Sequence, residues 1–254
     1  MILDQFQLNG RVALVTGAAQ GLGQGYAVAL AEAGADVAAL DRAEVTETGR
    51  AIVALGRRFM PLTCDLRETS VDGLNKLVGD VVAQMGRLDI LVNNAGIIRR
   101  APAIEFSEKD WDDVLQINLK AAFFLSQAAA RVMVPQGGGK IINVASMLSF
   151  QGGVIVPSYT AAKSGIAGIT RALANEWAKH HINVNAIAPG YMSTDNTAAL
   201  RADPARNQAI LDRIPAGRWG TPDDLKGIVV FLASSASDYM QGAIVPVDGG
   251  WLTR

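Results

Sequence analysis

The stretch RVALVTGAAQGLGQGYAVALAEA, residues 11–33, places an apolar run, a glycine-rich loop and a helix-compatible segment directly one after another. Glycine lets the backbone turn tightly and approach a ligand closely, and the first turn of a helix presents unpaired N–H groups with a partial positive charge. We therefore expect this loop to hold the phosphates of a dinucleotide, although a tight turn without a ligand would also favour glycine. The loop residues expected to contact the dinucleotide are Gly17, Gln20, Gly21, Leu22 and Gly23.

Short apolar or β-branched runs recur along the rest of the chain, with helix-compatible segments between them. This alternation predicts an α/β protein: a single-domain Rossmann fold over residues 1–254, with a doubly wound, seven-stranded parallel sheet and helices on both faces. Ligands of such sheets bind outside the carboxyl ends of the strands, and we interpret residues 191–215 as a substrate lid that crosses this edge. The expected strands are residues 11–16, 36–40, 59–64, 90–93, 140–144, 182–187 and 243–247.

The composition argues against several classes of protein. The 23 basic and 24 acidic residues are scattered along the chain, so there is no basic stripe for nucleic acid, and we expect no nucleic-acid partner. The single cysteine, Cys64, is expected to be a buried thiol, and the adjacent His180 and His181 suit a helix end better than a metal site. Because there is no basic-then-apolar leader and no long apolar run, we expect a cytoplasmic protein without membrane contact.

Two acidic residues follow predicted strands at the dinucleotide end. Asp41 stands where a carboxylate can accept hydrogen bonds from the adenosine ribose and repel a ribose phosphate, which favours NAD over NADP. Arg42 comes next and could turn toward such a phosphate, and a plain surface turn is the alternative for Asp41. Asp65 is placed to meet the adenine, but it could equally cap a helix.

Four polar residues are candidates for the chemistry. Tyr159 and Lys163 are four residues apart in a helix-compatible stretch, so both project from one face, and an ammonium beside a phenol lowers the pKa of the phenol. A phenol with a pKa near neutrality is a suitable acid/base for an alcohol. Ser146 could bond the reacting oxygen and Asn118 could hold a water; a helix cap and a buried amide are their alternatives.

Taken together, these motifs resemble the short-chain dehydrogenases/reductases (SDR family) over essentially the whole chain. The matching elements are TGAAQGLG at 16–23, NNAG at 93–96, YTAAK at 159–163, the pair Pro189-Gly190, and Asn118 and Ser146. The resemblance implies that Asn118, Ser146, Tyr159 and Lys163 form a catalytic tetrad and that Tyr159 and Lys163 also contact the cofactor. It further implies cofactor contacts from Leu66, Asn93, Ala95, Gly96, Pro189, Gly190, Met192 and Thr194.

Within this family, segments such as NNAGIIRR, ASMLSFQGG and VDGGWLTR are similar to bacterial sugar-acid enzymes, the 2-dehydro-3-deoxy-D-gluconate 5-dehydrogenases of pectin breakdown. This resemblance implies an NAD(H)-linked interconversion of that acid and its 5-keto form, in a homotetramer. Related alternatives are a gluconate 5-dehydrogenase, a reductase of unsaturated uronates and a secondary-alcohol enzyme. A sugar-nucleotide epimerase fits the glycine spacing less well, and a non-catalytic dinucleotide sensor would not need the four polar residues together.

A sugar acid needs a cation, and Arg99 and Arg100 follow the NNAG loop directly. We expect one of them to bind the substrate carboxylate, with Arg218 in reserve; a solvated pair on a loop is the alternative. Ser149, Phe150 and Gln151 are further substrate candidates beside Ser146 and Tyr159, and Tyr191 and Met192 could join them from the lid.

Overall fold

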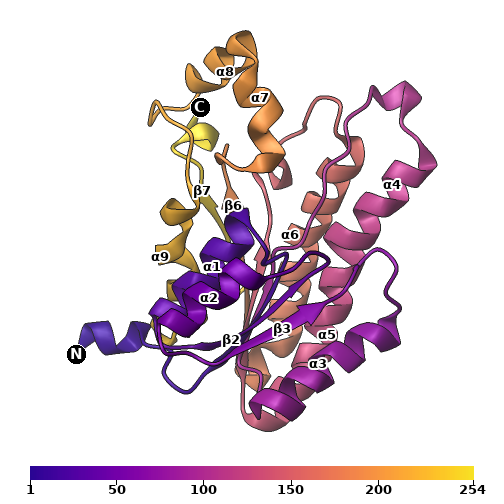
Figure 1. Cartoon of the computed structure of the whole chain (residues 1–254). Coiled ribbons are helices and arrows are strands. Elements are labelled where there is room, and N and C mark those ends of the chain that lie inside the picture. Colours follow the sequence, from indigo (N-terminus) through magenta and orange to yellow (C-terminus); the bar gives the residue numbers. More distant parts are fainter.

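In the computed structural model, which describes all 254 residues, seven parallel strands form one sheet in the order β3-β2-β1-β4-β5-β6-β7 (Figure 1). The predicted seven-stranded parallel sheet is therefore confirmed, and each strand lies within two residues of its expected bounds. The strands are β1 Val12–Thr16, β2 Asp36–Asp41, β3 Phe59–Thr63, β4 Ile90–Asn93, β5 Gly139–Val144, β6 Ile182–Pro189 and β7 Ile244–Val247.

Helices cover both faces of the sheet, as the alternation of strand and helix predicts (Figure 1). One face is packed by α1, α2 and α9, and the other by α3, α5 and α6. No helix is long and apolar enough to cross a membrane. The helices are α1 Gly21–Glu32, α2 Thr46–Ala54, α3 Val71–Met85, α4 Glu108–Leu115, α5 Ala122–Gln136, α6 Pro157–Trp177, α7 Ala198–Ala202, α8 Pro204–Leu211 and α9 Lys226–Ala233.

The two cores explain why the strands lack polar alternation. Successive residues of a strand point to opposite faces, so in β1 Ala13 and Val15 enter the core under α1 and α9, whereas Val12 and Leu14 enter the core under α3 and α5. All five residues of β1 are buried. A strand covered on both faces therefore reads as a continuous apolar run.

The chain changes direction between β1 and β4. From β1 it proceeds outward to β2 and β3, and then returns to β4 on the other side of β1, with Leu14 flanked by Ala38 of β2 and Leu91 of β4. The loops that leave β1 and β4 therefore part at the carboxyl edge of the sheet. Ligands of doubly wound sheets bind in the crevice that such a reversal opens.

An extension rises above this edge and contains α7 and α8 (Figure 1). It has a small core of its own, in which Ile210 and Ile214 pack with Met147 and Trp251. The aromatic rings of Tyr191 and Trp251 meet at a centroid distance of 4.7 Å. The extension is thus joined to the C-terminal turn and to the segment after β5.

Because Leu91 is fully buried at the centre of the sheet, we predict that Leu91→Ala lowers the free energy of unfolding by about 2–5 kcal/mol. Urea unfolding followed by circular dichroism measures this loss. The control is Val53→Ala in α2, where the side chain is 59% exposed and the expected change is within about 0.5 kcal/mol. Equal, small losses in both variants would contradict the central position of β4.

Candidate active site

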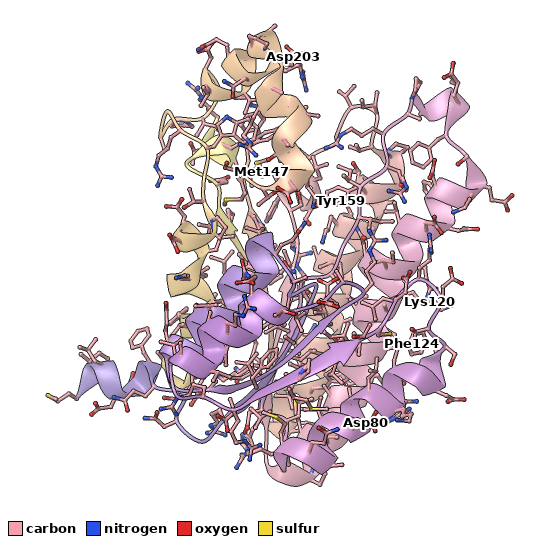
Figure 2. The ribbon with its side chains drawn as sticks, in the orientation of Figure 1. Asp80, Lys120, Phe124, Met147, Tyr159 and Asp203 are labelled. Carbon is pink, nitrogen blue, oxygen red and sulfur yellow. The ribbon has the colours of Figure 1, made fainter.

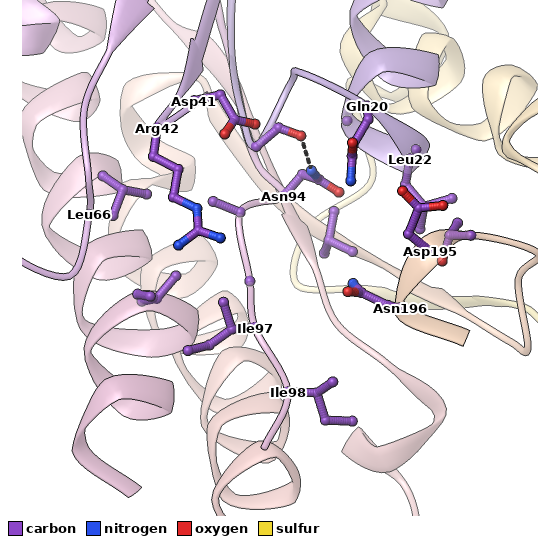
Figure 3. Close-up of a pocket in the computed structure, with 18 of the residues that line it drawn as sticks. Gln20, Leu22, Asp41, Arg42, Leu66, Asn94, Ile97, Ile98, Asp195 and Asn196 are labelled. Atoms are coloured by element: carbon purple, nitrogen blue, oxygen red, sulfur yellow. Dashed lines mark hydrogen bonds between the residues drawn. The ribbon is translucent and has the colours of Figure 1, made fainter. Parts of the chain in front are cut away.

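A cavity of about 560 Å³ lies at the carboxyl edge of the sheet, where the loops after β1 and β4 separate (Figure 3). Its walls come from the glycine loop, the ends of β2 and β3, the NNAG loop, α6 and the start of the extension. The predicted site residues that line it are Gly17, Gln20, Gly21, Leu22, Gly23, Asp41, Asp65, Leu66, Ala95, Gly96, Arg100, Tyr159, Lys163 and Thr194.

The glycine loop has the shape that a phosphate cradle requires. Gly21 begins α1 with a positive φ of 59°, so a side chain there would be strained. A Cβ on Gly23 would collide with the carbonyl oxygen of Gly17, so only glycine allows the helix to start this close to the loop. The N-terminus of a twelve-residue helix therefore faces the cavity, which suits the pyrophosphate of a nicotinamide dinucleotide.

Asn94, which the sequence analysis did not single out, fixes this loop (Figure 3). Its Nδ2 donates to the carbonyl oxygens of Thr16 at 2.9 Å and of Gly17 at 3.1 Å. The Thr16 hydroxyl in turn accepts from the backbone N–H groups of Asn94 and Ala95, both at 3.0 Å. The second asparagine of NNAG, at a strand end facing a glycine loop, was the available signal.

The predicted cofactor contact of Asn93 is not supported by its position. Asn93 is buried and outside the cavity wall. Its Nδ2 donates to Ser126 Oγ and to Asn143 Oδ1, both at 2.9 Å, so it joins β4 to β5 and α5. Pro189, Gly190 and Met192 also lie outside the wall, because β6 and its end pack against the protein's own core and its C-terminal turn.

Asp41 and Arg42 stand side by side where the end of β2 forms the cavity wall (Figure 3). The Asp41 carboxylate accepts from the backbone N–H of Ala19 at 3.0 Å and from that of Ala43 at 3.1 Å. One charge thus holds the glycine loop against β2. The Arg42 side chain is exposed and extends into the cavity.

The end of β3 supplies the next part of this wall. Asp65 accepts from the backbone N–H of Arg67 at 2.9 Å, so it caps a turn rather than a helix, because α3 starts only at Val71 with Ser70 as its cap; the residue also lines the cavity. Cys64 is half-buried and not fully buried as expected, because its thiol faces the cavity edge and bonds with the Thr69 hydroxyl at 2.8 Å.

Elsewhere on the cavity wall, α6 presents Tyr159 and Lys163 from one face. Tyr159 lies beneath the extension (Figure 2). Lys163 is buried, and its Nζ donates to the carbonyl oxygen of Val144, at the end of β5, at 2.6 Å. The same ammonium lies 5.6 Å from the centroid of the Tyr159 ring. Ser146, two residues after Val144, lies next to the Tyr159 phenol.

The expected lowering of the Tyr159 pKa by Lys163 is not what the structure gives. Burial raises the pKa of Tyr159, while a hydrogen bond with Ser146 and the positive charge of Arg100 oppose the rise. The Lys163 ammonium is directed at Val144 and the face of the ring rather than at the phenol oxygen. Burial also lowers the pKa of Lys163, to about 8.

Asn118 occupies a π-helical turn, Gln116–Ala121, between α4 and α5. Its Oδ1 accepts from the backbone N–H of Ile97 at 2.8 Å, and its Nδ2 donates to the Ile97 carbonyl at 2.9 Å. Both ends of the amide are therefore used by one residue of the protein. The side chain positions the segment after the NNAG loop, and the expected water contact through this amide is not supported.

Three candidate substrate residues have protein partners instead. Ser149 donates to the Lys163 carbonyl at 2.6 Å and so fastens the segment after β5 to α6. Gln151 accepts from Arg213 at 3.3 Å. Neither Ser149 nor Gln151 lines the cavity. Arg218 makes two hydrogen bonds to Asp224, at 2.8 and 2.6 Å, and lies outside the cavity wall, so its position does not support the role of reserve cation.

The two arginines after the NNAG loop differ in their partners. Arg99 pairs with Asp110 at 3.1 Å. Arg100 forms no ion pair; one Nη donates to the backbone carbonyl of Asn196 at 3.3 Å, and its charge acts on Tyr159. Arg100 is therefore the arginine without an ion pair on the stretch of wall near Tyr159, where an anionic substrate could bind it.

The chain is similar along its whole length to known dehydrogenases. A family model described as enoyl-(acyl carrier protein) reductase matches residues 17–252. A 2-dehydro-3-deoxy-D-gluconate 5-dehydrogenase of Escherichia coli (strain K12) is 64% identical, with 100% of each chain covered. The protein of the same name from Bacillus subtilis (strain 168) is 51% identical, over 99% of this chain and 98% of the relative.

A solved structure agrees with these relatives. A protein from Agrobacterium tumefaciens, named as a 2-deoxy-D-gluconate 3-dehydrogenase and crystallised with NADP, superposes with a TM-score of 0.92. It is 56% identical, over 99% of this chain and 100% of that one. The family model, the relatives and the arrangement of Tyr159, Lys163 and Ser146 lead to one conclusion: the chain belongs to the short-chain dehydrogenase/reductase family.

Proposed function

We propose that the protein is an NAD(H)-dependent oxidoreductase that interconverts 2-dehydro-3-deoxy-D-gluconate and its 5-keto form. The observation that carries this proposal is one cavity with a glycine-loop cradle at one end, and Tyr159, Lys163 and the unpaired Arg100 at the other. The names of the relatives at 64% and 51% identity support the choice of substrate.

The chemical step at the substrate is a proton transfer by Tyr159. In the oxidative direction the phenolate accepts the proton of the substrate hydroxyl, and in reduction the phenol returns it to the oxygen. Ser146, which lies next to the phenol and favours its ionised form, orients that oxygen. The nicotinamide coenzyme supplies the hydride chemistry when bound, held by the glycine loop, by Lys163 and by Thr194.

Burial affects Tyr159 and Lys163 in different ways. Tyr159 is half-buried, and a phenol shielded from water keeps its proton at neutral pH, because loss of hydration disfavours the anion. Ser146 and Arg100 counteract this penalty, so they assist the oxidative direction, in which the phenolate is needed. Lys163 contributes a buried positive charge with a weakened hold on its proton.

The substrate carboxylate is assigned to Arg100. An arginine pairs with a carboxylate through two parallel hydrogen bonds, which gives orientation as well as binding. Its position on the wall that also contains Tyr159 would set the distance between the acid group and the carbon that reacts.

We assign NAD as the preferred coenzyme because the Asp41 carboxylate would repel a phosphate on the adenosine ribose. Arg42 could bind the ribose phosphate of NADP, so we propose that the enzyme also uses NADP, with lower activity. The proposed setting is a cytoplasmic homotetramer of single-domain subunits that acts on sugar acids from pectin, with residues 191–215 as the lid.

The role of Tyr159 predicts that Tyr159→Phe lowers kcat by about 10²–10⁴-fold while the affinity for NADH stays within about threefold, because the phenol oxygen carries the proton and the ring packing is retained. Absorbance at the nicotinamide wavelength measures turnover, and fluorescence titration measures NADH binding. A Phe variant that turns over at nearly the wild-type rate would refute the assignment.

The lowered pKa of Lys163 predicts a pH-dependent stability difference between the wild type and Lys163→Met. From about pH 8 upward the folded chain releases the proton that the unfolded chain, with a pKa of about 10.4, still holds. The wild type should therefore gain stability relative to the Met variant as pH rises from 8 to about 9.5. Urea unfolding at several pH values tests this, and parallel profiles would contradict the buried charge.

For the coenzyme and substrate, we predict a higher kcat/KM with NADH than with NADPH when the 5-keto acid is reduced. Asp41→Asn removes the repelling charge but keeps an acceptor, and should raise the NADPH/NADH ratio about tenfold, roughly 1.4 kcal/mol. Arg42→Ala should lower the rate with NADPH and leave the rate with NADH unchanged.

Assays over a panel of keto and hydroxy sugar acids test the proposed substrate. A better substrate that lacks the 3-deoxy group would overturn the assignment.

A further inference from the structure

The two ends of the extension are attached to the rest of the protein in different ways. Its downstream end is held firmly: the Ala216 N–H donates to the Gly249 carbonyl at 3.0 Å, and Arg254 donates to the Asp212 carbonyl at 2.6 Å. The Arg213 guanidinium also stacks 4.0 Å from the centroid of Trp251. Apolar packing and several hydrogen bonds therefore fix this end.

The upstream end, the turn Asp195–Thr197 and helix α7, is mostly bonded to itself. Thr197 Oγ1 donates to the Met192 carbonyl at 2.6 Å, and Arg201 donates to the Thr194 carbonyl at 3.0 Å. Within 195–202 a single hydrogen bond reaches the sheet and its loops, from Arg100 to the Asn196 carbonyl at 3.3 Å. Apart from Leu200 of α7, which packs against the small core of the extension, this end is thus held down by one long hydrogen bond to a neutral acceptor.

Arg100 has the capacity to hold a second group at the same time. A guanidinium carries five N–H groups, and a single one is used within the protein. The cavity wall places Arg100 next to Asp195, Asn196 and Thr197 on one side and near Tyr159 on the other. Asp195 and Asn196 border the cavity from the extension (Figure 3).

We propose that Arg100 determines specificity for acids by coupling the substrate carboxylate to closure of the upstream end of the lid. This inference rests on the proposed sugar-acid function. A carboxylate on the free N–H groups fixes the guanidinium, which then holds the Asn196 carbonyl in place. A neutral sugar leaves the guanidinium mobile and the turn held by one weak bond, so it loses turnover as well as affinity.

Limited trypsin digestion tests the coupling, because Arg201 and Arg206 lie within α7 and α8. With NADH bound, 2-dehydro-3-deoxy-D-gluconate should slow cleavage at these two sites at least fivefold in the wild type. The protection should fall below twofold in Arg100→Ala and be partial in Arg100→Lys, which keeps the charge but not the fork. The matched control is Arg99→Ala, which should keep the protection. Arg99 is adjacent to Arg100 and pairs with Asp110 in the wild type.

The kinetic arm compares the acid with its neutral alcohol analogue. Arg100→Ala should lower kcat/KM for the acid at least a hundredfold, with part of the loss in kcat, and for the neutral analogue less than fivefold. Three outcomes would each overturn the coupling. In the digestion, these are full protection in Arg100→Ala and no protection by the acid in the wild type. In the kinetics, it is an equal loss of kcat/KM for the acid and for its neutral analogue. Proteolysis needs no turnover, so its result is separate from a failure of the proposed reaction, which the coenzyme assay detects.

Discussion

The Thr16 hydroxyl connects the two strands on which the whole site depends. At the end of β1 it donates to the Val92 carbonyl of β4 at 3.3 Å and accepts from the N–H groups that begin the NNAG loop. Asn94 completes the link from the other side through the carbonyl of Gly17. Because the chain leaves these neighbouring strands in opposite directions, the same bonds that join their ends also define where the cavity opens.

Burial is the second constraint, and it acts on both proton-carrying groups of the site. It raises the pKa of Tyr159 and lowers that of Lys163, so each residue is shifted toward its neutral form. Removal of these groups from water strengthens the remaining charge interactions with them. Arg100 therefore affects the phenol although its contact to the protein is a single backbone bond. A residue suited to select the substrate thus also influences the proton affinity of the acid/base.

The order of strands, glycine loop and helices could be predicted because it depends on local patterns: apolar runs, glycines and helix starts. Which side chain faces the cavity could not always be predicted. Asn93 and Asn94 are adjacent amides, and since both faces of β4 are buried, the sequence does not reveal which one points inward. The positions of Ser149 and Gln151 outside the cavity wall could not be predicted, because their partners, Lys163 and Arg213, are distant in sequence. For Arg218 a signal existed, since Thr221 and Asp224 form a capping box whose carboxylate also binds the guanidinium.

The two ends of the extension are held mainly by different interactions: apolar packing at the downstream end and hydrogen bonds at the upstream turn. Apolar packing among Met147, Ile214 and Trp251 is non-directional and involves no residue of the cavity wall. The upstream turn instead depends on hydrogen bonds from arginines to backbone carbonyls, which are directional and can be shared with an anion. A ligand can therefore alter the polar end without disturbing the apolar one. This arrangement confines any response to the substrate to the end that borders the cavity, next to Tyr159.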